Sequence, residues 1–185
     1  SNKCRAAIAA LEKMQNPIWS WFGHAQPFQF EDNFTPAPDI SKFAIGTPAI
    51  ISLAAMEPGL DLVLEAGIEN LRAKSRQQTQ FLWRMISSEL TPSGFVFASP
   101  ANADERGSHI SIQHENASQI CQALTEPKNG SKTIIPDFRP PNNIRLGIAP
   151  LYTSYSELFE TVVRIKEIMY TKEYEHFEKE IKNVP

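Results

Sequence analysis

Three short segments of this sequence carry residue types that could bind a small molecule or act on it. Residues 18–24 read IWSWFGH and place two tryptophans beside a glycine and a histidine. Thr47 is followed directly by Pro48, and Arg145 stands inside the otherwise apolar segment NNIRLGIAPLY. Each of the three also has a simpler structural interpretation.

The residue types determine what chemistry each segment could do. Aromatic side chains at this density can form a hydrophobic plug, a platform on which bases stack, or the wall of an active site. Thr47 and Pro48 are typical of a helix start, where the free N–H groups can also bind a phosphate. Arg145 either pairs with a carboxylate of the chain itself or captures the carboxylate of a ligand, for which its planar guanidinium is well suited.

Other catalytic and metal-binding patterns are missing from the sequence. The histidines do not follow the spacing of metal ligands, since His109 and His114 lie five residues apart on or near a strand. There is no Ser/His/Asp arrangement, and the eight glycines are scattered and form no phosphate-binding loop. We therefore expect neither a metal site nor serine-type catalysis.

The composition describes a globular protein that does not bind nucleic acid. The 185 residues are 42% hydrophobic, and a net charge of −3 with a pI near 5.8 offers no basic face to a phosphate backbone. Apolar runs such as residues 49–56 are shorter than the roughly 18 residues that a membrane span needs. Cys4 and Cys121 form no metal or redox motif. These features predict a cytoplasmic protein with reduced thiols, no signal peptide and no membrane partner.

The first half of the chain predicts loops followed by helices. Prolines are frequent in the first third, so residues 16–46 are expected to be mostly extended loop. Thr47 should cap a short apolar helix over residues 48–56, which the Pro58-Gly59 pair should end. A long helix over residues 60–90 follows, apolar at both ends and polar in the middle, which is typical of a bridge between two domains.

The second half predicts a small layered domain. Ser154 and Glu157 form a capping box at the start of a strongly amphipathic helix. With the other periodic segments, this gives the order β-β-α-β-β-α and an α+β fold, a mainly antiparallel sheet with helices on one face. The segments are strands at 95–97, 108–113, 133–135 and 144–149, a helix at 116–124, and a short charged helix at 174–182.

Five motifs occur in an order that resembles one enzyme family. WFGH, GTPAI, ERGSHISI, PDFRPPNNIRLGIAPLY and SELFETVVRI resemble, in sequence, the C-terminal half of kynureninase over residues 11–172. Kynureninases are fold-type-I pyridoxal-phosphate hydrolases that cleave kynurenine to anthranilate and alanine in tryptophan breakdown. The resemblance implies that residues 1–59 are a remnant of the large α/β cofactor domain, residues 60–90 an interdomain helix, and residues 91–185 the small C-terminal domain.

The resemblance also implies roles for individual residues. Trp21 and Thr47 match positions that contact the cofactor, both across the interface of a homodimer. Arg145 matches the arginine that grips the α-carboxylate of the substrate, and Phe22 and His24 lie close to the substrate. The IWSWFGH segment is thus expected to line a cofactor site at a dimer interface.

Parts of such a site are not found in this sequence. The lysine that holds the cofactor, the aspartate that pairs with the pyridine nitrogen and the phosphate-binding loop belong upstream of WFGH in the family. Lys3 lies too close to Trp21 to be that lysine, and Ser20 replaces the usual glycine. We therefore expect no catalytic residue in this chain, which would be catalytically incomplete. The segments 106–107 and 137–139 match family positions that we take to be structural.

Two alternatives remain open at this point. The chain could be the C-terminal part of another fold-type-I enzyme, a desulfurase or an aminotransferase, which would act on cysteine or a keto acid instead of kynurenine or 3-hydroxykynurenine. It could also be a non-catalytic relic that associates with partners through exposed apolar helices.

Overall fold

The computed structural model describes residues 10–179 except 12 and 129. The chain divides into two compact units, Ser1–Asp61 and Leu62–Pro185, which we treat separately. Lys3 and Cys4 lie outside the described residues. The three-part division at residues 59/60 and 90/91 stays a prediction.

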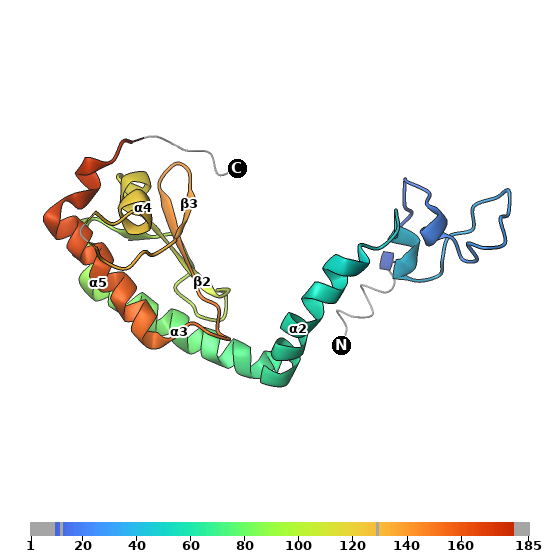
Figure 1. Cartoon of the computed structure of the whole chain (residues 1–185). Coiled ribbons are helices and arrows are strands. Elements are labelled where there is room, and N and C mark those ends of the chain that lie inside the picture. The colour runs from blue at the N-terminus through green and yellow to red at the C-terminus, as the bar shows by residue number, and fades with distance from the viewer. Residues whose placement is uncertain (1–9, 12, 129, 180–185) are drawn as a thin grey trace. The chain divides into compact units, whose positions relative to one another are not determined.

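The C-terminal unit is built on a four-stranded antiparallel sheet (Figure 1). The strand order is β1-β2-β4-β3, and every neighbouring pair is antiparallel. Because residues alternate between the two faces of a strand, β2 and β4 each have one buried apolar face and one polar face. The strands are β1 Val96–Phe97, β2 His109–Gln113, β3 Asp137–Arg139 and β4 Asn143–Gly147.

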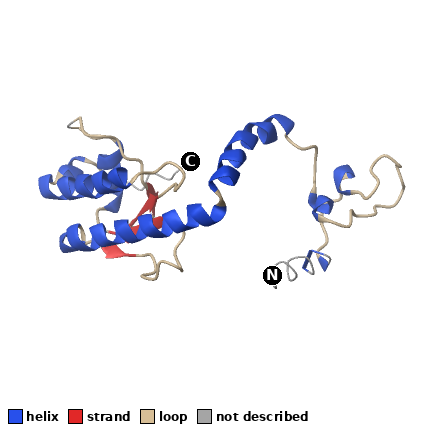
Figure 2. Ribbon diagram, turned by 90° about the horizontal axis from the view of Figure 1, so that it is seen from below, coloured by secondary structure: helices blue, strands red, loops and turns tan. Residues whose placement is uncertain are grey.

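Three helices cover the apolar face of this sheet (Figures 1 and 2). They are α3 Ile68–Glu89, α4 Ala117–Thr125 and α5 Tyr155–Thr171, and α5 packs along α3. Their buried side chains form one cluster with Ile110, Ile112 and Ile144 of the sheet, all fully buried. Burial in this cluster raises the pKa of the Cys121 thiol to about 12, so the thiol stays protonated. The predicted α+β layer is confirmed.

The start of α5 forms as its sequence predicts. The Ser154 hydroxyl accepts the Glu157 backbone N–H at 3.2 Å, and the Glu157 carboxylate accepts the Ser154 backbone N–H at 2.7 Å. These reciprocal bonds satisfy N–H groups that a helix start otherwise leaves without partners. The capping box therefore fixes where α5 begins.

The predicted helix break at Pro58-Gly59 is wrong. α2 runs from Ile50 to Ala66 straight through Pro58, and the break comes at Gly67, whose φ of 76° is the left-handed conformation that glycine adopts easily. A proline removes one helical hydrogen bond, and in this exposed helix water can satisfy the freed carbonyl. The predicted continuous helix over 60–90 is thus divided between the end of α2 and α3.

Three residues in the polar middle of α3, Ser75, Gln78 and Thr79, are buried, which the sequence analysis did not predict. Gln78 Nε2 donates to the Thr153 carbonyl at 2.6 Å, and the Ser75 and Ser108 hydroxyls lie 2.7 Å apart. Both side chains are almost fully buried within the C-terminal unit. These hydrogen bonds offset part of the cost of burying the polar groups, while the Gln78 Oε1 atom is buried without a hydrogen-bond partner.

Two further predictions are corrected in detail. Residues 133–135 form no strand, and the ladder bonds belong to β3, which begins at Asp137. The Ile134 N–H donates instead to the Leu124 carbonyl at the end of α4. In place of the charged helix predicted over residues 174–182 there is the 3-10 helix η4, Glu173–His176, which ends before Phe177, and residues 180–182 lie outside the described residues.

The N-terminal unit is mostly loop, as its prolines predict. Two short 3-10 helices interrupt it, η1 Trp21–Gly23 and η2 Ile40–Phe43, and they contact each other. Asp39 caps η2 by accepting the Ser41 backbone N–H at 2.9 Å.

A buried ion pair should make the stability of the C-terminal unit depend on pH. Arg164 Nη2 donates to both Glu173 carboxylate oxygens, at 2.7 and 2.8 Å, and their side chains are 6% and 10% exposed. Burial raises the Glu173 pKa. The hydrogen bonds and the charge of Arg164 lower this pKa by more than burial raises it, so the net pKa lies below the ordinary value. We expect Glu173→Gln to cost about 3 kcal/mol of unfolding free energy at pH 7, measured by urea denaturation.

The sign of the pH effect follows from the lowered pKa. The Glu173 contribution is fully present above the unfolded-state pKa of about 4.3 and is lost as pH falls through the folded-state pKa. The gap between wild type and Glu173→Gln should therefore close in acid. Glu175→Gln is the control, since Glu175 is exposed and lies 3.8 Å from Lys172. Equal losses in the two variants would contradict the assignment.

Candidate active site

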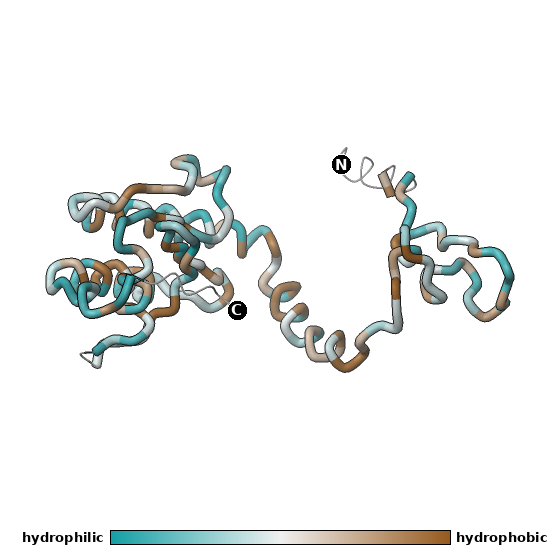
Figure 3. Tube along the Cα trace, turned by 90° about the horizontal axis from the view of Figure 1, so that it is seen from above, coloured by the Kyte–Doolittle hydropathy of each residue, from teal (hydrophilic) through white to brown (hydrophobic). Residues whose placement is uncertain are grey.

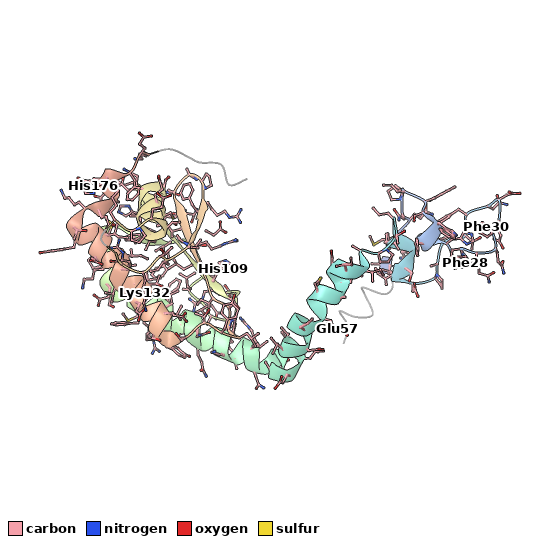
Figure 4. The ribbon with its side chains drawn as sticks, viewed as in Figure 1. Phe28, Phe30, Glu57, His109, Lys132 and His176 are labelled. Atoms are coloured by element: carbon pink, nitrogen blue, oxygen red, sulfur yellow. The ribbon has the colours of Figure 1, made fainter. Side chains whose placement is uncertain are left out.

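The aromatic segment folds into a cluster on the N-terminal unit. Trp21 packs edge-on against Phe22 and Phe28, with ring centroids 5.7 and 5.2 Å apart, and lies 6.2 Å from Phe30. Its indole N–H donates to the Pro27 carbonyl, which fixes the ring in place. Figure 4 labels Phe28 and Phe30 on this loop. Trp21 and Phe22 are still 49% and 39% exposed, so the cluster is a surface and not a core.

His24 is held by hydrogen bonds on both ring nitrogens. Nδ1 accepts the Gln26 backbone N–H at 2.9 Å, so the other nitrogen, Nε2, carries the proton in the neutral ring and points to the Asn33 carbonyl at 3.3 Å. The Glu31 carboxylate lies 3.9 Å from Nε2, and the Phe34 ring packs edge-on at 5.5 Å. The His24 side chain therefore links two parts of the loop through its contacts with the backbone of Gln26 and Asn33.

Backbone bonds close the same loop. The Ala25 N–H donates to the Thr35 carbonyl at 2.8 Å and the Ala37 N–H to the Gly23 carbonyl at 2.9 Å. Gly23 is buried against η2, where an added Cβ would lie 2.8 Å from the Lys42 carbonyl oxygen. The glycine of WFGH is thus required for the close approach of the two short helices.

The loop encloses an open hollow of about 420 Å³. Trp19, Trp21, His24 and Phe34 are among the residues that line it, whereas Phe22 is not. Phe30, also on its wall, has a positive φ of 52°, which is uncommon for a residue with a side chain. The size and aromatic wall suit a flat heteroaromatic ring.

Thr47 lies outside the helix that it was expected to cap. α2 begins at Ile50, so Thr47 and Pro48 precede it in extended chain and are exposed. The helix-cap prediction is wrong, because the first helical hydrogen bond joins the Leu53 N–H to the Ala49 carbonyl. The Thr47 hydroxyl is left accessible.

Arg145 occupies the polar face of the sheet in the C-terminal unit. Its neighbours Ile144 and Leu146 point into the core, so alternation puts the guanidinium on the opposite face. Across the ladders it stands opposite Ser111 of β2 and Asp137 of β3. Asp137 forms an ion pair with Arg145, and the Arg145 side chain is 39% exposed. Arg145 therefore has a partner within the chain while remaining accessible.

An open hollow of about 570 Å³ lies beside Arg145. His109, Tyr152 and Thr153 are among its other lining residues, and Figure 4 labels His109 on β2. Tyr152 is 80% exposed. Sequence reasoning treated His109 and residues 137–139 as structural, although a correct hairpin register would have placed Asp137 beside Arg145.

Within the described residues there is no group of three His, Cys, Asp or Glu side chains arranged to hold a metal ion. Among the helices of that same part of the chain, none combines the length and the apolar composition needed to cross a membrane.

Comparison with known proteins shows to which enzyme family the chain belongs. The kynureninase C-terminal domain model matches residues 71–165, about half of the chain and all of the sheet that carries Arg145. The chain belongs to the kynureninase family.

Individual kynureninases match beyond that domain. The kynureninase of Geobacillus thermodenitrificans is 44% identical over 162 residues, 86% of this chain and 37% of its own length. Those of Bacillus anthracis and Shouchella clausii are 40% and 38% identical, over 85% and 86% of this chain and 36% of each relative. The chain thus spans little more than a third of the kynureninases that it matches. The family match selects kynureninase over a desulfurase or an aminotransferase.

Two separate features of the N-terminal unit have chemistry that suits pyridoxal phosphate, although Thr47 does not line the hollow that Trp21 lines. An indole in an aromatic hollow can cover the pyridine ring, and an accessible threonine hydroxyl can donate to a phosphate. Of the lysines described in the N-terminal unit, Lys42 is buried and donates to the Leu11 carbonyl, so it is already engaged. The lysine that would hold the cofactor is not among the described residues of this loop.

We expect Gly23→Ala to loosen the aromatic loop. The new methyl group must push the Lys42 carbonyl away, at a cost of about 1–3 kcal/mol. Amide exchange at Ala25 and Ala37 should accelerate, which hydrogen-exchange NMR measures. Gly46→Ala is the matched control, since an added Cβ meets nothing within 4 Å there. Unchanged protection in Gly23→Ala would rule out the close approach as the element that holds the loop.

Proposed function

We propose that this chain forms the C-terminal part of a cytoplasmic, homodimeric kynureninase that hydrolyses kynurenine or 3-hydroxykynurenine to alanine and the corresponding anthranilate. The observation that carries the proposal is the family match over the sheet whose polar face bears Arg145. Pyridoxal phosphate, when bound, supplies the electron sink that allows a carbon–carbon bond of the amino acid to be hydrolysed.

In this proposal the described residues bind and orient, and the catalytic lysine comes from the upstream part of the enzyme. Trp21 and Thr47 contact the cofactor, the first through its ring and the second through its hydroxyl. Arg145 receives the substrate α-carboxylate, while Phe22 and His24 flank the aromatic part of the substrate. Arg145 is suited to its role because its guanidinium is half-exposed and projects from a rigid strand.

The exposed apolar surface of α2 supports the proposal that another part of the enzyme packs against this helix. Ile51, Leu53, Met56 and Leu64 are all more than half exposed, and apolar residues recur around the helix in Figure 3. A helix that is apolar all round is normally buried. The matched kynureninases are nearly three times as long as the aligned segment, so we propose that their upstream portion covers α2.

A chimera tests the proposed activity. This chain would replace the aligned segment of the Geobacillus thermodenitrificans kynureninase, and anthranilate release would be followed by fluorescence. We expect kynurenine cleavage by the chimera and none by the upstream portion alone. A chimera that folds and binds the cofactor, but leaves kynurenine intact, would count against the proposal.

Arg145→Ala in the chimera should weaken substrate binding. Losing one charge-assisted contact at a half-exposed site costs about 2 kcal/mol, or ~30-fold in kcat/KM. Steady-state kinetics with kynurenine measures this loss. Arg76→Ala is the control, because Arg76 also forms an exposed ion pair, with Asp104 at 2.6 Å. Equal kinetics for both variants would remove Arg145 from the site.

A further inference from the structure

One carboxylate on the polar face of the sheet is shared by two arginines. Asp137 Oδ2 accepts a hydrogen bond from Arg139 Nε at 3.0 Å, and it forms ion pairs with Nη2 of Arg139, also at 3.0 Å, and with Nη2 of Arg145. Asp137 stands directly opposite Arg145 in the β3–β4 ladder, where facing side chains are nearest neighbours. The contact is therefore set by strand register and not by chance encounter of two long side chains.

The cluster is not neutral. One carboxylate faces two guanidinium groups, so the three side chains leave one positive charge at the polar face. His109 is the remaining titratable residue of the four described strands, and it carries no negative charge. A second carboxylate, supplied by a ligand, would complete the charge balance. The single carboxylate of Asp137 thus does not neutralise the two arginines.

Arg145 keeps donors free for such a ligand. Among the described residues Asp137 is its ion-pair partner, and the contact uses Nη2. A guanidinium has five N–H donors in a fixed plane, so one engaged nitrogen orients the group and leaves others for a bidentate contact. A flexible arginine loses conformational entropy when it binds, and a side chain that is already held loses less.

We propose that Asp137 is a positioning residue that orients the Arg145 guanidinium for the substrate carboxylate, with Arg139 holding Asp137 in turn. The proposal rests on the proposed function of Arg145. The opposite role, in which Asp137 competes with the substrate for Arg145, predicts tighter substrate binding when Asp137 is removed. Positioning predicts weaker binding.

The kinetic experiment uses the chimera with Asp137→Asn, Asp137→Glu and Arg145→Ala. Asp137→Asn should raise KM for kynurenine about tenfold and change kcat less than about threefold, because an oriented contact is lost and the reacting groups are not. Asp137→Glu should recover part of the loss, since it keeps the charge. Asp104→Asn is the matched control, removing an exposed carboxylate that pairs with Arg76.

A double-mutant cycle separates positioning from a general structural effect. If Asp137 acts through Arg145, Asp137→Asn should add little to Arg145→Ala. Full additivity, or a lower KM in Asp137→Asn, would overturn the proposal. If Arg145→Ala itself leaves KM unchanged, the function proposed for Arg145 fails instead.

A second measurement on the 185-residue chain does not depend on activity. The NMR order parameter of the Arg145 Nε–H group should fall in Asp137→Asn and stay unchanged in Asp104→Asn. An Arg145 side chain equally ordered in wild type and Asp137→Asn would show that Asp137 does not position it, whatever the kinetics of the chimera.

Discussion

The alternation of side chains along β2 and β4 is the constraint on which the C-terminal unit depends. Ile110, Ile112, Ile144 and Leu146 are buried beneath α3, α4 and α5, and a one-residue shift in the register of either strand would turn its apolar side chains toward water. The same period of two sends Arg145 to the opposite face. Hydrophobic burial thus stabilises the domain and also determines that Arg145 lies on the polar face of the sheet.

The parts of the fold that depend on local chemistry could be predicted from the sequence. The Ser154 capping box, the alternating strand at Ile110 and Ile112 and the proline-rich loops each follow from a few neighbouring residues. The helical passage through Pro58 could not be predicted in the same way. Its outcome depends on whether the freed carbonyl reaches water and on where a left-handed glycine is available, which here is Gly67.

Tertiary partners explain the remaining differences. Gln78 and Ser75 are buried because Thr153 and Ser108, far away in sequence, offer them hydrogen bonds. Residues 133–135 were predicted to be a strand, but the strand forms at residues 137–139. Because the strand was misplaced in the prediction, the pairing of Asp137 with Arg145 was not foreseen. The segments that contain Trp21, His24 and Thr47 were site candidates by their residue types, and the resemblance suggested their roles. The geometry of Trp21 and His24 became known only from the folded loop.

The β3–β4 hairpin imposes a parity rule on the evolution of this segment. Replacing a side chain in residues 143–147 alters one position, but inserting or deleting an odd number of residues there reverses inside and outside for everything on one side of the change. Such a frame error would drive a guanidinium into the hydrocarbon interior and expose an isoleucine in its place. The fold therefore constrains the length of this strand more strictly than it constrains the side chain at any exposed position within it.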